Sequence, residues 1–580
     1  MKITGAELFV KALLAEQVDT LFAYPGGQVI DLFNALYGVR KINVILPRHE
    51  QGLVHAADGY ARSTGKVGVC LVTSGPGAAN LVTGIATANY DSVPLVCFTG
   101  QVPTYLIGSG AFQEVDIVAM TKSISKYAIT VRRREDLAAV IKKAFFIARS
   151  GKPGVVVVDL PKDIQQAFGS SDYPEQIKVE EYKANENIYM GQIKKSLECL
   201  KNAKRPVFLL GGGVNIVRAN REMTLLVEKT GIPAVTTMMG KGAIPTPHPL
   251  YVGNLGIHGS YAANMAVSSC DVLFSIGVRF NDRIMGKVSE FAKNAAHIRV
   301  DIDSVSISKN VAADISIVAD AKKIIQILLE KVPECDFKDW QKQVDFWKRS
   351  HPLTASQDRK LRMTPFHIIR EINQVFENAI ITTDVGQHQL WVGQFLELNG
   401  QKQMLTSGGF GTMGYGLPAA IGAKLGNPDK DVIAVCGDGG IQMNIQEMAT
   451  AVVYELPVVI CILNNGYLGN VRQWQELFYD KRYSSTCLRR RKSCSLTCNT
   501  MLACCPEYIP DFMRLAESYG AKAIRVRRPE EIRMALEEAQ NTRRVPTVIE
   551  FIIEPTENVF PIVPPGNPLS EMMMEGRGND

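Results

Sequence analysis

Two polar clusters at the ends of apolar runs are the residues of this sequence best suited to chemistry. The run VIAVC leads into Gly437-Asp438-Gly439, and the run VVICIL leads into Asn464-Asn465-Gly466. Asp438 and Asn465 are about one β-α-β unit apart, so both are expected at the carboxyl ends of parallel strands, where open α/β sheets bind ligands. Carboxylate and amide oxygens suit a hard cation such as Mg²⁺, and glycines let an anion approach the backbone. The pattern predicts a Mg²⁺-bridged diphosphate, with a following helix pointing at the anion; the plain alternative is two turns whose Asp and Asn cap helices.

Three alternations of strand and helix must position these clusters. The expected strands are NVILP, VGVCLVTS, PLVCFTG and VVVVDLP in the first unit; VFLLGGG, AVTTMMG, VLFSIG and HIRVDID in the second; and AIITTD, VIAVCGDG, VVICILNN and TVIEFII in the third. Near-continuous apolar strands separated by helices are typical of parallel sheets covered on both faces. We therefore expect an α/β protein of three doubly wound parallel-sheet domains, one fold used three times. The predicted boundaries are 1–165, 188–332 and 362–556, with a polar linker at 166–187, a charged crossing at 333–361 and a tail at 557–580.

Composition sets the class of protein. The 580 residues carry a formal net charge of +6, with 46% apolar and 21% charged residues, which excludes a disordered, collagenous or coiled-coil chain and gives no argument for nucleic acid. No apolar run reaches the length of a membrane helix, and the amphipathic start lacks the apolar core of a signal peptide. We expect a cytoplasmic protein without membrane contact, and the cysteines within apolar strands, such as Cys70 and Cys436, agree as buried reduced thiols.

The GDG and NN motifs resemble the diphosphate motif of thiamine-diphosphate enzymes. The resemblance then extends over nearly the whole chain to the acetohydroxyacid (acetolactate) synthase catalytic-subunit family. It is carried by PGG at 25–27, RHEQGLVHAADGYARSTGKVG at 48–68, TSGPGAANLVTG at 73–84, AFQE at 111–114, DLPKDIQ at 159–165, GVRFNDR at 277–283, DVGQHQLW at 384–391, GFGTMGYGLPAAIGAK at 409–424 and RQW at 472–474. The resemblance implies a carboligase that decarboxylates pyruvate and adds the two-carbon unit to pyruvate or 2-oxobutyrate. The products, 2-acetolactate or 2-aceto-2-hydroxybutyrate, would feed valine, leucine and isoleucine synthesis.

The resemblance also implies roles for single residues. Glu50 would bond the aminopyrimidine ring and favour its imino form, although a lone Glu there would only be a helix-start carboxylate. Met413 would wedge under the bent cofactor, and Trp474 would shape an acceptor pocket that favours 2-oxobutyrate. The implied catalytic set is Glu50, Gly26, Gln113, Lys162 and Trp474, with Phe112 beside Gln113 and Lys162 at the substrate entrance. The implied thiamine-diphosphate set is Pro25, Gly26, Gly27, Glu50, Gln387, His388, Gly411, Met413, Gly437, Asp438, Gly439, Gly440, Asn465, Tyr467 and Gly469, with Mg²⁺ on Asp438, Asn465 and Tyr467.

The middle unit would bind FAD if the resemblance holds there. Its strand-to-loop turns carry glycines and donors suited to phosphates. The implied residues are Gly211, Gly212, Gly213, Thr237, Met238, Gly240, His258, Gly259, Arg279, Asp282, Arg283, Asp301 and Asp320. The RFNDR segment has Asn281 where the family more often has Asp. Because carboligation transfers no net electrons, the flavin would be structural or inherited.

One stretch departs from the family. Residues 487–509 hold Cys487, Cys494, Cys498, Cys504 and Cys505 beside Arg489, Arg490 and Arg491. Clustered thiols near cations could bind Zn²⁺ or an iron–sulfur cluster, but the spacing is not that of a zinc ribbon. The plain alternative is a reduced cysteine-rich loop.

Partners and competing functions follow from the same segments. Glu50 and Asp438 lie in different units, so one cofactor between them favours a homodimer or homotetramer. A separate small regulatory subunit is expected, because this chain carries no obvious regulatory domain. A pyruvate-oxidase-type flavoenzyme is the main alternative. A glyoxylate-using carboligase would lack Glu50, and a non-catalytic scaffold would not need Glu50, Asp438 and Asn465.

Overall fold

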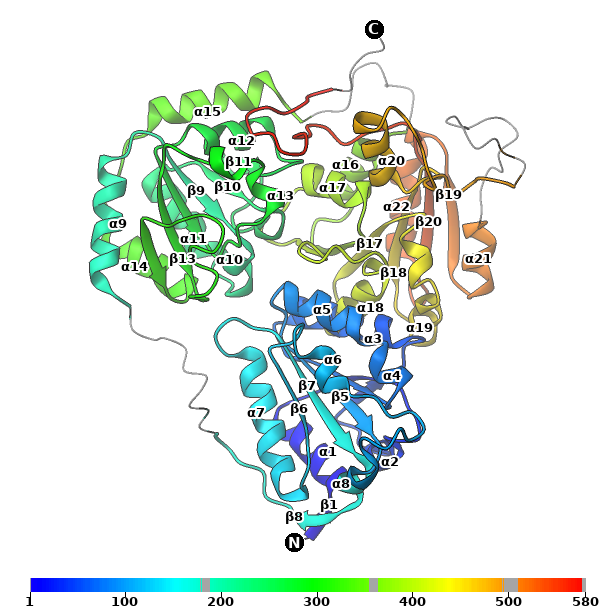
Figure 1. Ribbon diagram of the computed structural model, residues 1–580. Helices are drawn as coiled ribbons and strands as arrows, with labels where there is room; N and C mark the ends of the chain where they lie inside the picture. The colour runs from blue at the N-terminus through cyan, green and yellow to red at the C-terminus, as the bar shows by residue number, and fades with distance from the viewer. Residues whose placement is uncertain are drawn as a thin grey trace.

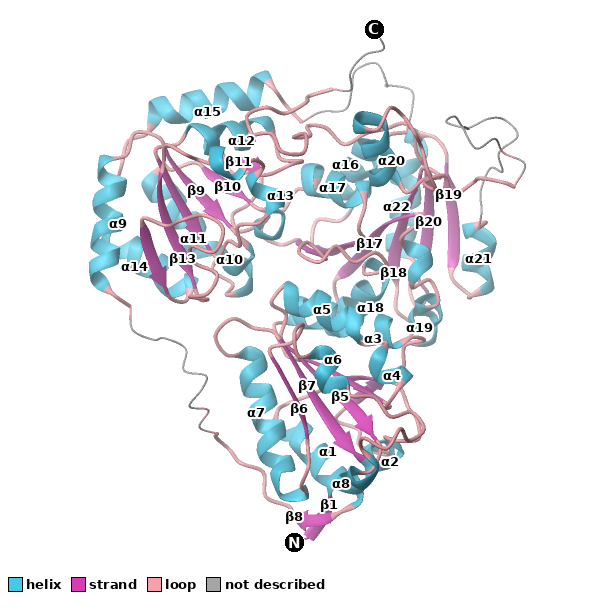
Figure 2. Cartoon of the chain, in the orientation of Figure 1, coloured by secondary structure: helices cyan, strands magenta, loops and turns pink. Residues whose placement is uncertain are grey.

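The computed structural model describes residues 2–177, 179, 188–353, 363–492, 494 and 510–575, and three six-stranded sheets organise this part of the chain (Figures 1 and 2). Every strand pair within these three sheets is parallel. Alternate residues of a strand enter different apolar clusters: Val69 and Leu71 join one, Cys70 and Val72 another. Both faces of the sheet are therefore covered, as the continuous apolar runs predict.

The N-terminal sheet has the strand order β3-β2-β4-β5-β7-β6. Its strands are β2 (Thr20–Ala23), β3 (Asn43–Ile45), β4 (Gly68–Val72), β5 (Leu95–Gln101), β6 (Tyr127–Thr130) and β7 (Val155–Pro161). Its helices are α1 (Gly5–Ala15), α2 (Ile30–Leu36), α3 (Glu50–Thr64), α4 (Pro76–Ala79), α5 (Val82–Tyr90), α6 (Ile117–Thr121), α7 (Leu137–Arg149) and α8 (Lys162–Gln166). A short antiparallel pair, β1 (Lys2–Thr4) with β8 (Phe168–Ser170), joins the start of the unit to its exit.

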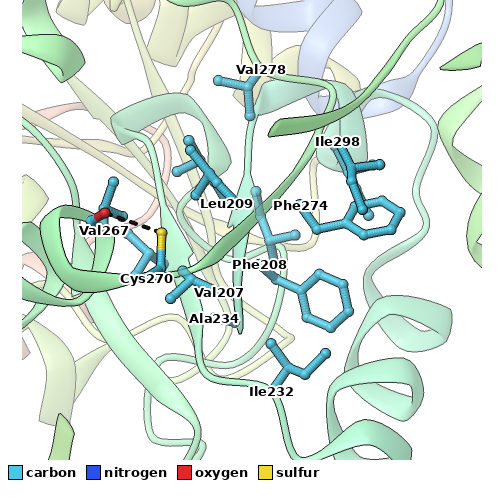
Figure 3. Packing of buried hydrophobic residues seen from close by; sticks show 14 of the residues in the cluster. Val207, Phe208, Leu209, Ile232, Ala234, Val267, Cys270, Phe274, Val278 and Ile298 are labelled. Atoms are coloured by element: carbon cyan, nitrogen blue, oxygen red, sulfur yellow. Dashed lines mark hydrogen bonds between the residues drawn. The ribbon is translucent and has the colours of Figure 1, made fainter. Parts of the chain in front are cut away.

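The central sheet has the order β11-β10-β9-β12-β13-β14. Its strands are β9 (Pro206–Leu210), β10 (Ala234–Thr236), β11 (Tyr251–Asn254), β12 (Val272–Ile276), β13 (Ala296–Asp301) and β14 (Ile315–Val318). Its helices are α9 (Met190–Asn202), α10 (Gly212–Ile216), α11 (Asn220–Thr230), α12 (Tyr261–Ser269), α13 (Asp282–Met285), α14 (Ala321–Lys331) and α15 (Lys338–Ser350). Phe208 and Phe274 pack edge to face at 5.6 Å in its core (Figure 3).

The C-terminal sheet has the order β16-β15-β17-β18-β20-β19. Its strands are β15 (Ala379–Thr383), β16 (Gln403–Thr406), β17 (Asp431–Gly437), β18 (Val458–Asn464), β19 (Lys522–Val526) and β20 (Thr547–Ile552). Its helices are α16 (Pro365–Val375), α17 (Gln387–Phe395), α18 (Gly416–Gly426), α19 (Glu447–Val453), α20 (Gly469–Phe478), α21 (Phe512–Ser518) and α22 (Ile532–Asn541).

Two expectations about organisation need correction. The outer sheets share one strand order, but the central sheet differs, because two consecutive strands lie on one side of its first strand instead of one. The two outer units therefore share one topology, and the central unit has a different one. The expected linker also contains β8, and the charged crossing contains the amphipathic helix α15. The boundaries given for the three units stay predictions.

The N-terminal and C-terminal units meet through α3 and α18, which lie side by side in Figure 1. A Cβ on Gly59 would overlap the carbonyl of Ala419, and a Cβ on Gly422 would overlap the carbonyl of Ala56. Only glycine permits this approach of two helices. Within the described ranges, no helix is long and apolar enough to cross a membrane.

Candidate active site

Several of the predicted residues lie at the switch points of the outer sheets. In each of these sheets the chain reverses its direction of growth between two neighbouring strands, β2 and β4 in the first and β15 and β17 in the last. Such reversals open a crevice at the carboxyl ends of the strands. Residues 24–28 and 73–77 follow β2 and β4, and residues 384–388 and 438–440 follow β15 and β17.

At the C-terminal edge, Asp438 and Asn465 follow adjacent parallel strands, as predicted. Asp438 Oδ2 accepts the Gly466 N–H at 3.0 Å, and Asn465 Nδ2 donates to Gln387 Oε1 at 3.2 Å. Both side chains are buried, and burial raises the pKa of Asp438 to about 7. The two predicted metal ligands and Gln387 therefore share one buried edge.

The plain alternative of two capping residues holds only in part. Asn465 Oδ1 does accept the Tyr467 N–H at 3.0 Å, a local turn of the expected kind. Asp438 instead bonds across to the turn after the neighbouring strand. The helix expected directly after GDG is also displaced, because a 3₁₀ turn, Ile441–Met443, comes first and α19 begins only at Glu447.

Glycines shape this edge into a cradle. A Cβ on Gly437 would lie 2.9 Å from His388 Nδ1, and one on Gly440 would lie 2.8 Å from the Asp384 carboxyl. A Cβ on Gly469 would overlap Gln387 Oε1. His388 Nε2 and Asp384 Oδ2 are buried without a hydrogen-bond partner among the described residues. Closely approachable backbone beside unpartnered polar atoms fits a bound diphosphate.

Met413 and Gly411 lie beside this cradle on the loop before α18. A Cβ on Gly439 would be 3.8 Å from Met413 Cε, so Met413 borders the GDG turn. Gly411 has a φ of +75°, a left-handed conformation that favours glycine. The predicted wedge therefore lies next to the predicted diphosphate residues.

The prediction of Mg²⁺ is not tested by the clustering of typical metal-binding side chains. The described residues contain no group of three or more His, Cys, Asp or Glu placed to hold a metal. The predicted set of Asp438, Asn465 and Tyr467 includes only one residue of those types, so Mg²⁺ stays a prediction.

At the N-terminal edge, Glu50 is the first residue of α3 and is half-buried. Asn80 Nδ2 donates to Glu50 Oε2 at 3.0 Å, and a Cβ on Gly77 would lie 3.3 Å from Glu50 Oε1. Gly26 packs so closely on Thr73 that a Cβ would lie 2.5 Å from its side chain. Gly27, by contrast, has nothing within 4 Å of a Cβ position and leaves open space. Pro25 lies between β2 and these glycines.

Lys162 and Gln113 join this edge from two further loops. Lys162, at the start of α8, donates to the Gly27 carbonyl at 3.0 Å. Gln113 has a φ of +60°, and its Cα would be 2.9 Å from a Cβ on Gly75. Phe112 is 85% exposed. The predicted entrance residues thus lie on the rim of the edge that holds Glu50.

One buried carboxylate, Glu447 at the start of α19, joins the C-terminal unit to the N-terminal unit of the same chain. Its oxygens accept the Arg48 N–H at 3.0 and 3.1 Å and the His49 N–H at 3.0 Å, directly before Glu50. Burial raises the pKa of Glu447. A residue of the C-terminal unit therefore holds the backbone that presents Glu50.

Trp474 lies on α20, after the NN turn. Its Nε1 is buried without a hydrogen-bond partner among the described residues, and its ring packs edge to face with Phe478 at 5.6 Å. Both the pocket-wall and the packing interpretation of this tryptophan fit these contacts.

A cavity of about 860 Å³ lies at the switch point of the central sheet, between β9 and β12. A Cβ on Gly211 would overlap the Gly277 carbonyl, so the turns after these two strands touch only because both are glycine. All three units contribute to the wall. Of the predicted FAD residues, the lining includes Gly212, Gly213, Thr237, Met238, Arg279, Arg283, Asp301 and Asp320.

Five predicted FAD residues lie outside this lining: Gly211, Gly240, His258, Gly259 and Asp282. Gly211 and Gly240 instead let neighbouring turns pack closely. His258 is largely enclosed, and burial lowers its pKa to about 4. The Asp282 side chain is 84% exposed. The cavity nevertheless has the size of a ligand pocket, with glycine turns and cations that fit a dinucleotide.

Sequence reasoning missed several polar residues of these sites: Asn80, Asp91, Asp384 and Glu447. Asp384 could have been identified from the sequence, because it ends the apolar run AIITTD in the same way that Asp438 follows the run VIAVCG. Its carboxyl accepts the Gly414 N–H at 2.8 Å, and burial raises its pKa to about 7. The others act through contacts between distant segments, for which the sequence carries no signal.

The cysteine-rich stretch lies mostly outside the described residues. Cys487 and Cys494 are free thiols, and Tyr467 forms a single antiparallel bridge with Cys487. Cys498, Cys504 and Cys505 are outside the described ranges, so the Zn²⁺ or iron–sulfur site stays a prediction.

Comparison with known proteins adds independent findings. Three family profiles match: "Thiamine pyrophosphate enzyme, N-terminal TPP binding domain" over residues 3–120, its central domain over 193–328 and its C-terminal TPP binding domain over 384–551. The chain is 44% identical to a "Probable acetolactate synthase large subunit" of Methanocaldococcus jannaschii, covering 98% of this chain and 95% of the relative. It is 41% identical to "Acetolactate synthase isozyme 3 large subunit" of Escherichia coli strain K12, covering 99% and 98%. An "Acetolactate synthase large subunit" of Cyanidium caldarium is 42% identical over 98% and 96%.

The chain belongs to the acetolactate synthase large-subunit family. The predicted α/β class and the resemblance are thereby confirmed. These relatives support the acetolactate synthase reading over the pyruvate-oxidase alternative. The two thiamine pyrophosphate binding profiles match this chain in its outer units, where the two polar edges lie.

Proposed function

We propose that the protein is the catalytic subunit of an acetolactate synthase that joins two molecules of pyruvate, or pyruvate and 2-oxobutyrate. One observation carries this proposal. Two units with the same strand order present complementary residues at equivalent switch points, an acid with an amide partner on one and a buried oxygen-lined cradle on the other. An enzyme that uses thiamine diphosphate needs one edge to bind the aminopyrimidine ring of the cofactor and another to bind its diphosphate.

The C-terminal edge would hold the diphosphate end of thiamine diphosphate. His388, Gln387 and the backbone of Gly437 to Gly440 would face its phosphates, and Asp438, Asn465 and Tyr467 would hold Mg²⁺. Because metal ligands must be deprotonated, Asp438 would bind Mg²⁺ in its anionic form. Met413, beside the GDG turn, would support the cofactor from below.

The N-terminal edge would perform the proton chemistry. When bound, thiamine diphosphate supplies a carbon that takes up the acyl unit of pyruvate as CO₂ leaves and passes it to the second 2-oxo acid. Glu50 would hold a proton against a ring nitrogen, while Asn80 fixes the orientation of its carboxylate. Gln113, Lys162 and Trp474 would bind and orient the two oxo acids, and Phe112 would keep water from the entrance.

We further propose that a complete site needs two chains. Glu50 is bonded to Asn80 of its own unit and Asp438 to Gly466 of its own unit, so each chain offers two half-sites. A twofold dimer would pair each half with its complement. A tetramer and a small regulatory subunit, in keeping with relatives named "large subunit", are part of the same proposal.

The central cavity would hold FAD. Gly212 and Gly213 would take its diphosphate at the switch point, Asp301 would meet a ribose, and Arg279 and Arg283 would supply positive charge. Asn281 also lines the cavity, and its Oδ1 is buried without a partner among the described residues. An amide donor and acceptor at this position is compatible with a neutral ligand group.

The test is a reconstitution without oxygen. The pure protein is incubated with pyruvate, thiamine diphosphate, Mg²⁺ and FAD, and 2-acetolactate is measured. We expect product that disappears when thiamine diphosphate is omitted. Oxidation of pyruvate with an added electron acceptor, without acetolactate, would favour the oxidase alternative instead.

A further inference from the structure

A buried carboxylate, Asp91, lies where the three units meet, in the wall of the central cavity. Its Oδ1 is 3.5 Å from Arg279 Nη2 of the central unit. Its Oδ2 is 3.2 Å from Arg62 Nη2 of its own unit and accepts the Gly408 N–H of the C-terminal unit at 3.2 Å. One side chain thus binds a donor from each unit.

Gly408 belongs to the loop of residues 407–414, which carries Met413. Ser407 Oγ accepts the N–H groups of Gly411 and Thr412 at 3.1 and 3.0 Å, which folds the loop onto its own start. Thr412 also bonds Thr87 of the N-terminal unit at 2.6 Å. Because Asp91 fixes the start of this folded loop, a shift of Asp91 moves Met413 with it.

Gly409 is closely packed at the point where the three units meet. A Cβ there would lie 2.5 Å from Asp91 Oδ1 and 2.6 Å from Arg279 Nη2. The Arg279 guanidinium also lies over the Tyr90 ring at 4.9 Å, and that ring contacts Phe410 at 5.9 Å. The loop and the cationic wall of the cavity therefore pack against each other.

We infer that Asp91 is a positioning residue that couples the central cavity to the Met413 loop. Arg279 is one-third exposed and faces the cavity, so an anionic dinucleotide there attracts the same guanidinium that holds Asp91. Filling the cavity fixes Arg279, Asp91 and Gly408 together and orders the loop before the second cofactor binds. This inference rests on the proposed function, and it gives a redox-neutral carboligase a use for a flavin.

The coupling is measured as a ratio of affinities. Thiamine diphosphate is titrated by calorimetry into cofactor-free protein with excess Mg²⁺, with and without saturating FAD, and FAD is titrated with and without thiamine diphosphate. We expect FAD to tighten thiamine diphosphate binding about fivefold or more. Thiamine diphosphate should tighten FAD binding by the same coupling factor. In Asp91→Asn both ligands still bind, and the factor falls to about one, since uncoupled sites bind independently.

Asp58→Asn is the matched control. Asp58 is also buried, pairs with Arg62 at 2.7 Å and accepts the Tyr415 hydroxyl at 2.6 Å, so it too joins two units. A purely structural role of such carboxylates would change both variants alike, whereas we expect Asp58→Asn to lower Tm and keep the coupling factor. Gly409→Ala, which leaves every charge in place, is expected to reduce the factor and serves if Asp91→Asn does not fold.

Two results overturn the inference, provided that both ligands bind. One is a coupling factor of one in the wild-type protein, and the other is a coupling factor that stays unchanged in Asp91→Asn and Gly409→Ala. Loss of the factor in Asp58→Asn as well assigns it to general packing and overturns the inference too. A wild-type protein that binds no thiamine diphosphate overturns the proposed function, a result distinct from the others.

Discussion

The N-terminal and C-terminal units have the same strand order and place their polar residues at the same switch point, yet the two edges differ in chemistry. The N-terminal edge keeps one half-buried carboxylate, Glu50, with an amide partner. The C-terminal edge buries two carboxylates, Asp384 and Asp438, and their pKa values rise to about 7. The shared fold decides where a ligand binds, and the solvation of the acids decides what each edge can do. Glu50 is partly open to solvent, whereas the buried Asp438 is the acid proposed to bind a cation.

The largest effect is expected from removing the acid of the N-terminal edge. Glu50→Gln keeps the size and the amide contact to Asn80 but cannot hold the proton, so kcat should fall about 10²- to 10⁴-fold. Thiamine diphosphate binding, measured by calorimetry, should stay close to wild type because the diphosphate edge is untouched. Full activity in this variant would refute the role of Glu50.

Mixing two inactive variants tests whether the edges of two chains combine. Glu50→Gln and Asp438→Asn are each expected to be inactive. If sites form between chains, mixing and reassociation should restore about a quarter of wild-type activity, because about half of the dimers are mixed and each has one intact site. The readout is acetolactate formation. No recovery, despite mixed dimers seen by native mass spectrometry with one variant isotope-labelled, would place the whole site within one chain.

Two glycine substitutions compare a crowded position of the C-terminal edge with an open position of the N-terminal edge. Gly440→Ala places a Cβ 2.8 Å from buried Asp384 and should lower the free energy of unfolding by about 1–3 kcal/mol. Gly27→Ala meets nothing within 4 Å and should change it by less than about 0.5 kcal/mol. Denaturant unfolding of cofactor-free protein checks both. Equal losses would contradict the distinction between these two positions.

The last prediction is a pH dependence of the cofactor-free protein. Asp384 has a folded pKa of about 7, raised by burial from 3.8, so the folded state holds a proton that the unfolded state has lost. The free energy of unfolding should therefore fall as pH rises from about 4 to 7. Asp384→Asn should reduce this slope up to about pH 7, as should Asp159→Asn up to about pH 6, where burial places the pKa of Asp159. A slope unaffected by Asp384→Asn would show that this carboxyl ionises normally.

Apart from edge strand β3, which was predicted, the predicted strands are interior to the sheets, and most of the missed strands lie at the edges. Interior strands such as β5, β12 and β18 are buried along their whole length and form continuous apolar runs. The missed β6, β11, β14, β16 and β19 are all edge strands, where one side lacks a partner and polar residues intervene. Interior β2 was missed because it has only four residues.

The candidate sites were predictable where chemistry follows a strand directly. Asp438 and Asn465 each follow a strand directly, and local pattern finds them, whereas Glu50 was assigned only through the resemblance. Glu447 and Asp91 bind backbone that is hundreds of positions away, so their roles depend on how units pack. Periodicity contains no information on that packing.

The pairing of β1 with β8 also has a consequence for synthesis on the ribosome. The N-terminal unit can close as soon as Ser170 has left the exit tunnel, because Lys2 pairs with Ser170. Its helix α3 cannot be covered at that time, since Asp58 bonds a tyrosine 357 positions further along the chain. The glycine-bearing side of α3 therefore stays open to water and to other nascent chains during most of translation. The first unit to fold carries the surface that is covered last.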